Sequence, residues 1–302
     1  MNNQKPLDNR LRAYSSNKSI RLGVVQQDYL LSWILIGLAH VPELRANMIF
    51  KGGTALKKCY FGEYRFSEDL DFTALPGLLK GNYLEEKIDE AVNIAERLLE
   101  KYAPITITCE RYREKNRHPG SQEAFKIRAK FPKQREPLVT AMIEITFDEA
   151  VAILPEERKI MHAYEEMIEA KILTYSLEEI VIEKLRGILQ KTKKSHERSW
   201  TRSRARDYYD LWNIFRVYQE RLNFETIHKF LPEKCRAKDV TFTGVDDFFD
   251  SAMIEQTIKD WRHHLYYLVS DLPEFEIVKN ELRNDLETLI FSKNMKNELM
   301  LS

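Results

Sequence analysis

Two groups of residues near position 60 have the types and spacing to bind a nucleotide together with a metal. Gly52, Gly53 and Thr54 belong to the stretch KGGTALKK, and Asp69 and Asp71 follow in the stretch RFSEDLDF. Glycines let a backbone approach a triphosphate because they lack a Cβ atom, and a threonine at a helix start offers a hydroxyl and an N–H to an anion. Aspartates two apart on a strand share one face, where a divalent cation relieves their repulsion. Carboxylate oxygens are the ligands that Mg²⁺ prefers.

Each half of this pattern also has a purely structural explanation. A tight turn between a strand and a helix uses the same glycines, and two aspartates can simply line a solvated strand face. The G-x-x-x-x-G-K spacing of a Walker loop is absent. The presence of both halves in one short stretch is what favours a phosphate and metal site.

The elements that must position these residues follow from the hydrophobic pattern. The pattern predicts a short strand over residues 47–50, a helix from about Thr54, and a second strand over residues 65–73 that carries both aspartates on one face. An amphipathic helix is predicted next, and then three strand-like runs that suggest a sheet meander. The helix spans residues 83–102 and the three runs span residues 105–111, 124–131 and 141–147.

The character of the chain changes after Pro155. Ser176 and Glu179 have the spacing of a capping box at the start of a helix that continues to Gln190, and most of the chain beyond that helix is helical in pattern. We therefore predict an α+β (mixed α/β) protein. A mixed-sheet domain over residues 1–155 precedes a helical domain over residues 156–302, which we expect to pack against the first domain and close its cleft.

Composition excludes several classes of protein. Basic and acidic residues balance at 47 each, so no global charge draws the chain to nucleic acid or to a membrane. The three scattered cysteines lack metal-ligand spacing and suit a reducing compartment, so we expect a cytoplasmic protein. The apolar run over residues 29–39 is too short to span a bilayer and predicts a buried helix.

The two motifs around position 60 resemble those of the AbiEii/AbiGii toxin family, whose members are nucleotidyltransferase-like toxins of toxin–antitoxin pairs. Two later motifs extend the resemblance. The segment EKLRGIL at residues 183–189 is similar to the family's K-L-x-A-L motif, with Gly187 in place of the usual alanine, and RDYYDL at residues 206–211 is similar to R-D-x-Y-D-L. The four motifs occur in order over residues 47 to 215.

The resemblance implies a nucleotidyltransferase fold and a metal-dependent transfer of a nucleoside monophosphate from an NTP to an acceptor, with Mg²⁺ as the metal. We expect these site residues: catalytic Asp69, Asp71, Lys184 and Asp207; nucleotide-binding Gly52, Gly53, Thr54, Lys57, Ser67 and Lys184; metal-binding Asp69, Asp71 and Glu144.

The third carboxylate that this fold requires is expected on a neighbouring strand. Glu144 is the single acid within the apolar run AMIEITF, where a carboxylate is costly unless it is paired or metal-bound. We therefore favour Glu144 over Asp148, which follows the strand. A salt bridge from Glu144 to Arg128 or Lys130 is the structural alternative.

Lys184 lies within an apolar helix, where a lone lysine commonly extends to solvent. With the motif around it, we predict that Lys184 stabilises the charge that develops as pyrophosphate leaves. Asp207 and Asp210 lie three apart on one helical face, and Asp207 is the better candidate to orient Lys184 or to act near the reacting groups. Capping of the helix that begins there is equally consistent with the spacing.

The family implies a toxin that inhibits growth or phage propagation, a cognate antitoxin, and transfer RNA, at its 3′ end, as the acceptor. A basic segment over residues 191–206 holds seven Lys or Arg against the single acid Glu197, with His196 and Trp200 between them, which suits RNA contact or a solvated loop. Alternatives are transfer to a protein or to the hydroxyl of a small molecule, or a protein of the same fold that binds a nucleotide or a partner without catalysis.

Overall fold

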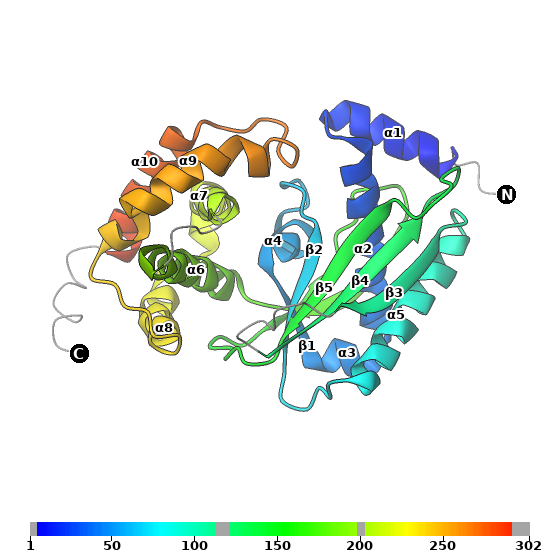
Figure 1. Ribbon diagram of the computed structural model, residues 1–302, viewed down its shortest axis with the longest axis horizontal. Helices are drawn as coiled ribbons and strands as arrows, with labels where there is room; N and C mark the ends of the chain where they lie inside the picture. Colours follow the sequence, from blue (N-terminus) through cyan, green and yellow to red (C-terminus); the bar gives the residue numbers. More distant parts are fainter. Residues whose placement is uncertain (1–4, 113–120, 198–202, 292–302) are drawn as a thin grey trace. The chain divides into compact units, whose positions relative to one another are not determined.

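The computed structural model describes residues 5–112, 121–197 and 203–291, and these form two compact units, which are drawn in Figure 1. Unit 1 comprises the chain up to Glu149 together with Pro155–Tyr175 and Leu268–Ser270. Unit 2 comprises Ala150–Leu154, Ser176–Tyr267 and the chain from Asp271 onward. The structure thus places residues 155–175 in unit 1, beyond the boundary predicted at residue 155.

A mixed sheet forms the centre of unit 1, and in the described residues its strand order is β3-β4-β5-β2-β1-β7-β6. The strands β3, β4 and β5 form the predicted antiparallel meander, β5 runs parallel to β2, and β1 is antiparallel to β2 and parallel to β7. The strands are β1 (Met48–Lys51), β2 (Asp69–Ala74), β3 (Thr106–Tyr112), β4 (Gln122–Lys130), β5 (Val139–Thr146), β6 (Glu156–Lys159) and β7 (Lys171–Thr174).

Helices α2 (Leu22–His40) and α5 (Asn82–Glu100) cover one face of this sheet (Figure 1). The apolar side chains of the central strands are fully buried, Leu70 and Phe72 in β2 and Ile143 and Ile145 in β5 among them. The two helices pack so closely that a Cβ atom on Gly37 would lie 2.1 Å from the carbonyl oxygen of Ala91. Because side chains alternate along a strand, the polar residues between these apolar ones lie on the opposite face.

Unit 1 also contains α1 (Leu7–Lys18), which packs on α2, and short helices next to β1. These short helices are α3 (Pro42–Asn47), α4 (Gly52–Ala55) and the π-helix η1 (Leu56–Phe61). Helix α4 continues directly into η1, so the predicted strand, glycine turn and helix around Thr54 are all present.

Helix α2 is long and apolar enough to cross a membrane by length and composition, but 72% of its most apolar window is buried within the protein. Tyr29, Leu30 and Ile34 have no exposed surface. A helix that is apolar on every side is expected in a protein core, so the predicted buried helix is confirmed.

Two sequence-based assignments were wrong. The second strand begins at Asp69 instead of residue 65, because the Phe66 N–H donates to the carbonyl of Leu268 outside the sheet. The region after Pro155 is not helical at first, since β6 and β7 pair with each other and β7 joins β1. The four charged residues of β6 carry no apolar alternation, so only tertiary pairing reveals this strand.

Unit 2 is helical, as predicted, and its core contains packed aromatic side chains. The rings of Trp261 and Phe275 lie 4.9 Å apart between centroids, and Tyr208 packs edge-on against Phe275. The elements are α6 (Leu177–Glu197), α7 (Ala205–Tyr218), η2 (Gln219–Arg221), α8 (Phe224–Arg236), η3 (Val245–Phe249), α9 (Ser251–Leu265), α10 (Phe275–Asp285) and η4 (Leu286–Ile290).

The predicted capping box at the start of α6 is half correct. The Ser176 hydroxyl accepts a hydrogen bond from the N–H of Glu179, as expected of an N-cap. The Glu179 carboxylate instead accepts from the backbone N–H groups of Ala152 and Ile153 and from Lys234. Glu179 therefore holds residues 150–154 against α6.

Candidate active site

The predicted metal ligands lie on the polar face of the sheet in unit 1. Asp69 and Asp71 are half-buried in β2, with Leu70 fully buried between them. In the register of β2 with β5, Asp71 is directly opposite Glu144. The three carboxylates thus share one face of two neighbouring strands, as the alternation predicted.

Glu144 is not placed to pair with the basic residues that the sequence offered as its structural alternative. It lies opposite Ala124 on β4, and its carboxylate accepts a hydrogen bond of 2.8 Å from the amide of Gln122. Arg128 lies opposite Thr140 and forms an ion pair with Glu110 instead.

The glycine turn between β1 and α4 lies directly against one of these carboxylates. Gly52 has a φ of +78°, which favours glycine, and a Cβ atom built on it would lie only 2.5 Å from Oδ2 of Asp71. A Cβ atom on Gly53 would lie 2.3 Å from Nη2 of Arg65. The two glycines therefore let the turn fit between a carboxylate and a guanidinium group.

The side chains of Thr54 and Lys57 stabilise this turn from within. Thr54 is fully buried, and its hydroxyl donates a hydrogen bond to the carbonyl of Asp69. The buried Lys57 ammonium donates to the carbonyls of Gly62 and Tyr64 and lies over the ring of Phe66. Their predicted contact with a nucleotide remains a prediction, as does that of Ser67, which is half-buried just before β2.

A second group of predicted residues comes together in unit 2. Lys184 on α6 lies with its Nζ 2.9 Å from Oδ1 of Asp207 and 2.7 Å from Oδ2 of Asp210, both on α7. The other oxygen of Asp207 pairs with Arg204 at 2.9 Å. Two cations and two carboxylates thus alternate in one cluster. Asp207 lies within hydrogen-bond distance of Lys184, as its predicted role in orienting Lys184 requires.

Asp207 does not cap α7, which was the alternative that the sequence allowed. The N-cap of α7 is Arg204, and Asp207 lies in the first turn with its carboxylate bound to Lys184 and Arg204. Burial by itself raises the pKa of Asp207, but the positive charges of Lys184 and Arg204 outweigh it and hold the pKa below its ordinary value. Asp207 is therefore ionised at neutral pH.

The chemistry of the carboxylate face suits Mg²⁺ bound together with a nucleotide. Among the residues that the structure describes, no three His, Cys, Asp or Glu side chains form a group that could hold a metal alone. Mg²⁺ in nucleotide sites is typically held by one or two carboxylates plus substrate phosphates. Asp69 and Asp71, with the glycine turn against Asp71, provide that combination.

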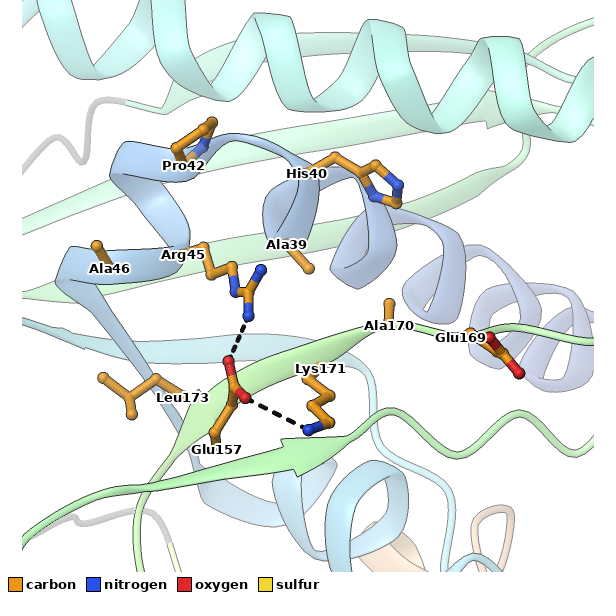
Figure 2. A pocket seen from close by; sticks show the side chains of 10 residues that line it. All are labelled: Ala39, His40, Pro42, Arg45, Ala46, Glu157, Glu169, Ala170, Lys171 and Leu173. Carbon is orange, nitrogen blue, oxygen red and sulfur yellow. Dashed lines mark hydrogen bonds and ion pairs between the residues drawn. The ribbon is translucent and has the colours of Figure 1, made fainter.

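A surface pocket of about 820 Å³ in unit 1 lies away from these residues. It is formed by the end of α2, by α3 and by β6 and β7, and in it Glu157 pairs with Arg45 and Lys171 (Figure 2). In the parallel register Thr174 lies beside Phe50, so Lys171 lies near the start of β1, whereas the glycine turn follows its end. None of the predicted site residues lines this pocket.

Some predicted features fall outside the described residues, and some residues of the site were missed. Residues 198–202 of the basic segment, Trp200 among them, lie in the part of the chain that is not described. Arg65 beside Gly53 and Arg204 beside Asp207 received no role from the sequence, whereas Asp210 was the second candidate to orient Lys184. Arg65 and Arg204 each lie within or beside a recognised motif, which is the only signal that points to them.

A mixed sheet that carries a glycine turn against paired carboxylates is the arrangement of a nucleotidyltransferase. The chain belongs to the family described as nucleotidyl transferase AbiEii toxin of type IV toxin–antitoxin systems, whose profile matches residues 33–288. The resemblance predicted from the four motifs is therefore confirmed.

A solved structure with the same fold is that of MenT4, a nucleotidyltransferase toxin from Mycobacterium tuberculosis H37Rv. The two chains are 16% identical, the match covers 98% of each, and the TM-score is 0.60. A search of curated proteins found no match. At this identity the likeness to MenT4 shows the fold, which agrees with the predicted fold class.

Proposed function

We propose that this toxin transfers a nucleoside monophosphate from an NTP to an RNA acceptor, the 3′ end of a transfer RNA. An acceptor hydroxyl oxygen forms a bond to the α-phosphorus, the bond from that phosphorus to the bridging oxygen breaks, and pyrophosphate leaves. The proton of the hydroxyl passes to solvent or to a nearby carboxylate.

The contact between Gly52 and Asp71 carries this proposal. A turn without side chains meets a carboxylate at a separation that any Cβ atom would prevent. A triphosphate that approaches this backbone therefore reaches a carboxylate that can share a cation with it. The plain alternative, a tight turn with a solvated aspartate nearby, does not require the two to be in contact.

Each residue of the site has a proposed role. Asp69 and Asp71 hold Mg²⁺, which when bound neutralises phosphate charge, and Glu144 is the further candidate ligand. The backbone of Gly52 to Thr54 binds the phosphates. Lys184, oriented by Asp207 and Asp210, supplies a compact positive charge for the departing pyrophosphate.

RNA as the acceptor is supported by the sequence of the basic segment. Its seven Lys or Arg residues within residues 191–206 provide the charge density that neutralises nucleic-acid phosphates. Membership in a toxin–antitoxin family supports growth inhibition as the outcome, a cognate antitoxin as a partner and NTP as the substrate. Inhibition of phage propagation and the cytoplasmic location remain predictions.

The test is to incubate the protein with Mg²⁺, total RNA and each α-labelled NTP in turn, beside an Asp69→Ala variant. We expect label on RNA with the wild-type protein and a loss of at least about 100-fold with the variant, as for a residue that acts in the transition state. Label on protein or on a small molecule would refute RNA as the acceptor and identify the true acceptor class. No label on any acceptor, or equal labelling by the variant, would refute the transfer itself.

A further inference from the structure

A fully buried ion pair joins η1, the helical segment that follows the glycine turn, to α2. Lys58 on η1 and Asp28 on α2 are each only 1% exposed, and Nζ of Lys58 lies 2.8 Å from Oδ2 of Asp28. Neither residue belongs to the predicted site. Charged side chains are seldom buried this deeply unless they are paired, so the pair has to be explained.

The hydrogen bonds of Lys58 join η1 to a single turn of α2. Its ammonium group donates to the Asp28 carboxylate, to the Asp28 carbonyl at 3.1 Å and to the Ser32 hydroxyl at 2.8 Å. The Tyr164 hydroxyl donates to the same Asp28 oxygen at 3.0 Å. Three donors of an ammonium group meet three acceptors, so the side chain has one position.

Burial and the ion pair shift the pKa of both members. Burial lowers the pKa of Lys58, and the neighbouring Asp28 carboxylate opposes that shift. Burial raises the pKa of Asp28, but the charges of Lys58 and Lys57 and the hydrogen bonds from Lys58 and Tyr164 together outweigh burial and hold that pKa below its ordinary value. Burying such a pair gives no more stability than well-packed apolar side chains of similar volume would, so stability alone does not explain it. The directional hydrogen bonds of the pair, which fix the position of η1, explain why it is buried there.

Lys58 reaches the glycine turn through continuous helical backbone. It lies four residues after Thr54, and α4 passes into η1 without a break. The N–H of Gly62 donates to the carbonyl of Lys57, the five-residue spacing of a π-helix, and the N–H of Met161 donates to the carbonyl of Lys58. Because its hydrogen bonds fix Lys58 on α2, the short helical backbone between Lys58 and the glycine turn limits how far Gly52 can move relative to Asp71.

We propose that Asp28 and Lys58 are positioning residues that fix the glycine turn for nucleotide phosphates. The inference rests on the proposed function, because it takes the turn as the phosphate-binding element. It assigns these two residues a role in NTP affinity, although neither touches the nucleotide.

The test variants are Lys58→Met and Asp28→Asn. Asp28→Asn keeps the size of the side chain, so it provides the test if Lys58→Met does not fold. Arg10→Met is the matched control, because Arg10 forms a similarly buried ion pair with Glu166 in the same unit, at 2.6 Å. The other bonds of Arg10 go to Lys5 and Glu165, not to α4 or η1. Each variant is assayed for KM and kcat in labelled-NTP transfer at a temperature at which circular dichroism shows it to be folded.

We expect the KM for NTP to rise about tenfold in the two test variants, with a smaller change in kcat, because small misplacements of a binding element are costly. The Arg10→Met control should leave KM within about twofold of wild type. An unchanged KM in a folded test variant, or an equal rise in the control, overturns the inference.

Amide hydrogen exchange separates this inference from the proposed function. Faster exchange at residues 52–55 is expected in Lys58→Met or Asp28→Asn and not in Arg10→Met. If the wild-type protein transfers no nucleotide, the proposed function fails, while exchange still shows whether the pair fixes the turn. Unchanged exchange at residues 52–55 in the test variants would overturn the positioning role.

Discussion

Replacing Gly52 by alanine is the perturbation whose consequences follow most directly from the geometry. The new Cβ atom would lie 2.5 Å from Oδ2 of Asp71, whereas ordinary contact begins at 3.4 Å. Either the turn or the carboxylate must therefore move by about 1 Å. In addition, alanine would have to adopt the φ of +78° that glycine adopts here.

The two effects have different magnitudes and different readouts. A left-handed conformation costs an alanine roughly 1–2 kcal/mol, which lowers the melting temperature by about 2–8 °C in a unit of this size. Displacement by about 1 Å of a group that binds the reacting phosphates costs about 100-fold in rate. Gly52→Ala should therefore lose far more activity than stability.

Gly81→Ala separates these two effects. Gly81 has a similar φ of +75°, yet a Cβ atom on it would meet no atom within 4 Å. It should show a comparable drop in melting temperature with unchanged activity. The assay is transfer of labelled nucleotide at a temperature at which both variants are folded, beside thermal unfolding followed by circular dichroism.

Two results would refute this reasoning. If Gly52→Ala retains wild-type kcat/KM, the contact with Asp71 has no part in catalysis. If Gly81→Ala loses activity to the same extent, the loss in Gly52→Ala reflects backbone strain and not the position of the carboxylate.

Three further predictions concern other parts of the protein. Gly53→Ala should displace the Arg65 guanidinium, which lies 2.3 Å from the new Cβ position, and should raise the KM for NTP about tenfold, measured by steady-state transfer. Asp210→Asn should destabilise unit 2 by roughly 2 kcal/mol, measured by urea unfolding, because the fully buried Asp210 loses its charge-assisted bond to Lys184, which keeps Asp207 as a partner. Glu166 is buried, which raises its pKa, but hydrogen bonds from His162 and Arg10 outweigh burial and lower the pKa from 4.5 to about 2. The stabilisation that Glu166 provides is therefore complete above pH 4.5 and is lost as the pH falls towards 2, so Glu166→Gln should flatten the acid side of the stability curve, measured by unfolding between pH 3 and 7.

Local sequence patterns predicted the elements that carry the family motifs. The alternation in β2 placed Asp69 and Asp71 on one face, and the helical period of α5 placed its apolar residues in the core. These predictions succeed because side-chain periodicity depends only on backbone geometry. The strand β6 and the start of β2 were missed because their pairing depends on distant segments, Lys171 to Thr174 and Leu268 among them.

Local patterns likewise predicted only those residues of the candidate site that lie in recognised motifs. Motif spacing pointed to Lys184 and Asp207, and the structure brings them within 2.9 Å. It gave no role to Arg65, because only the fold shows that its guanidinium lies against Gly53. The pair of Asp28 and Lys58 joins residues 30 positions apart, and no local pattern predicts such a contact.

The most direct test of the central claim is mass analysis of RNA from cells that express this chain or its Asp71→Asn variant. The variant keeps the shape of the side chain opposite Glu144 and beside Gly52 but removes its charge. The account predicts RNA, specifically transfer RNA, that is heavier by added nucleotides at the 3′ end in the wild-type sample alone. Unmodified RNA in the wild-type sample, or the same added mass with the variant, would contradict it.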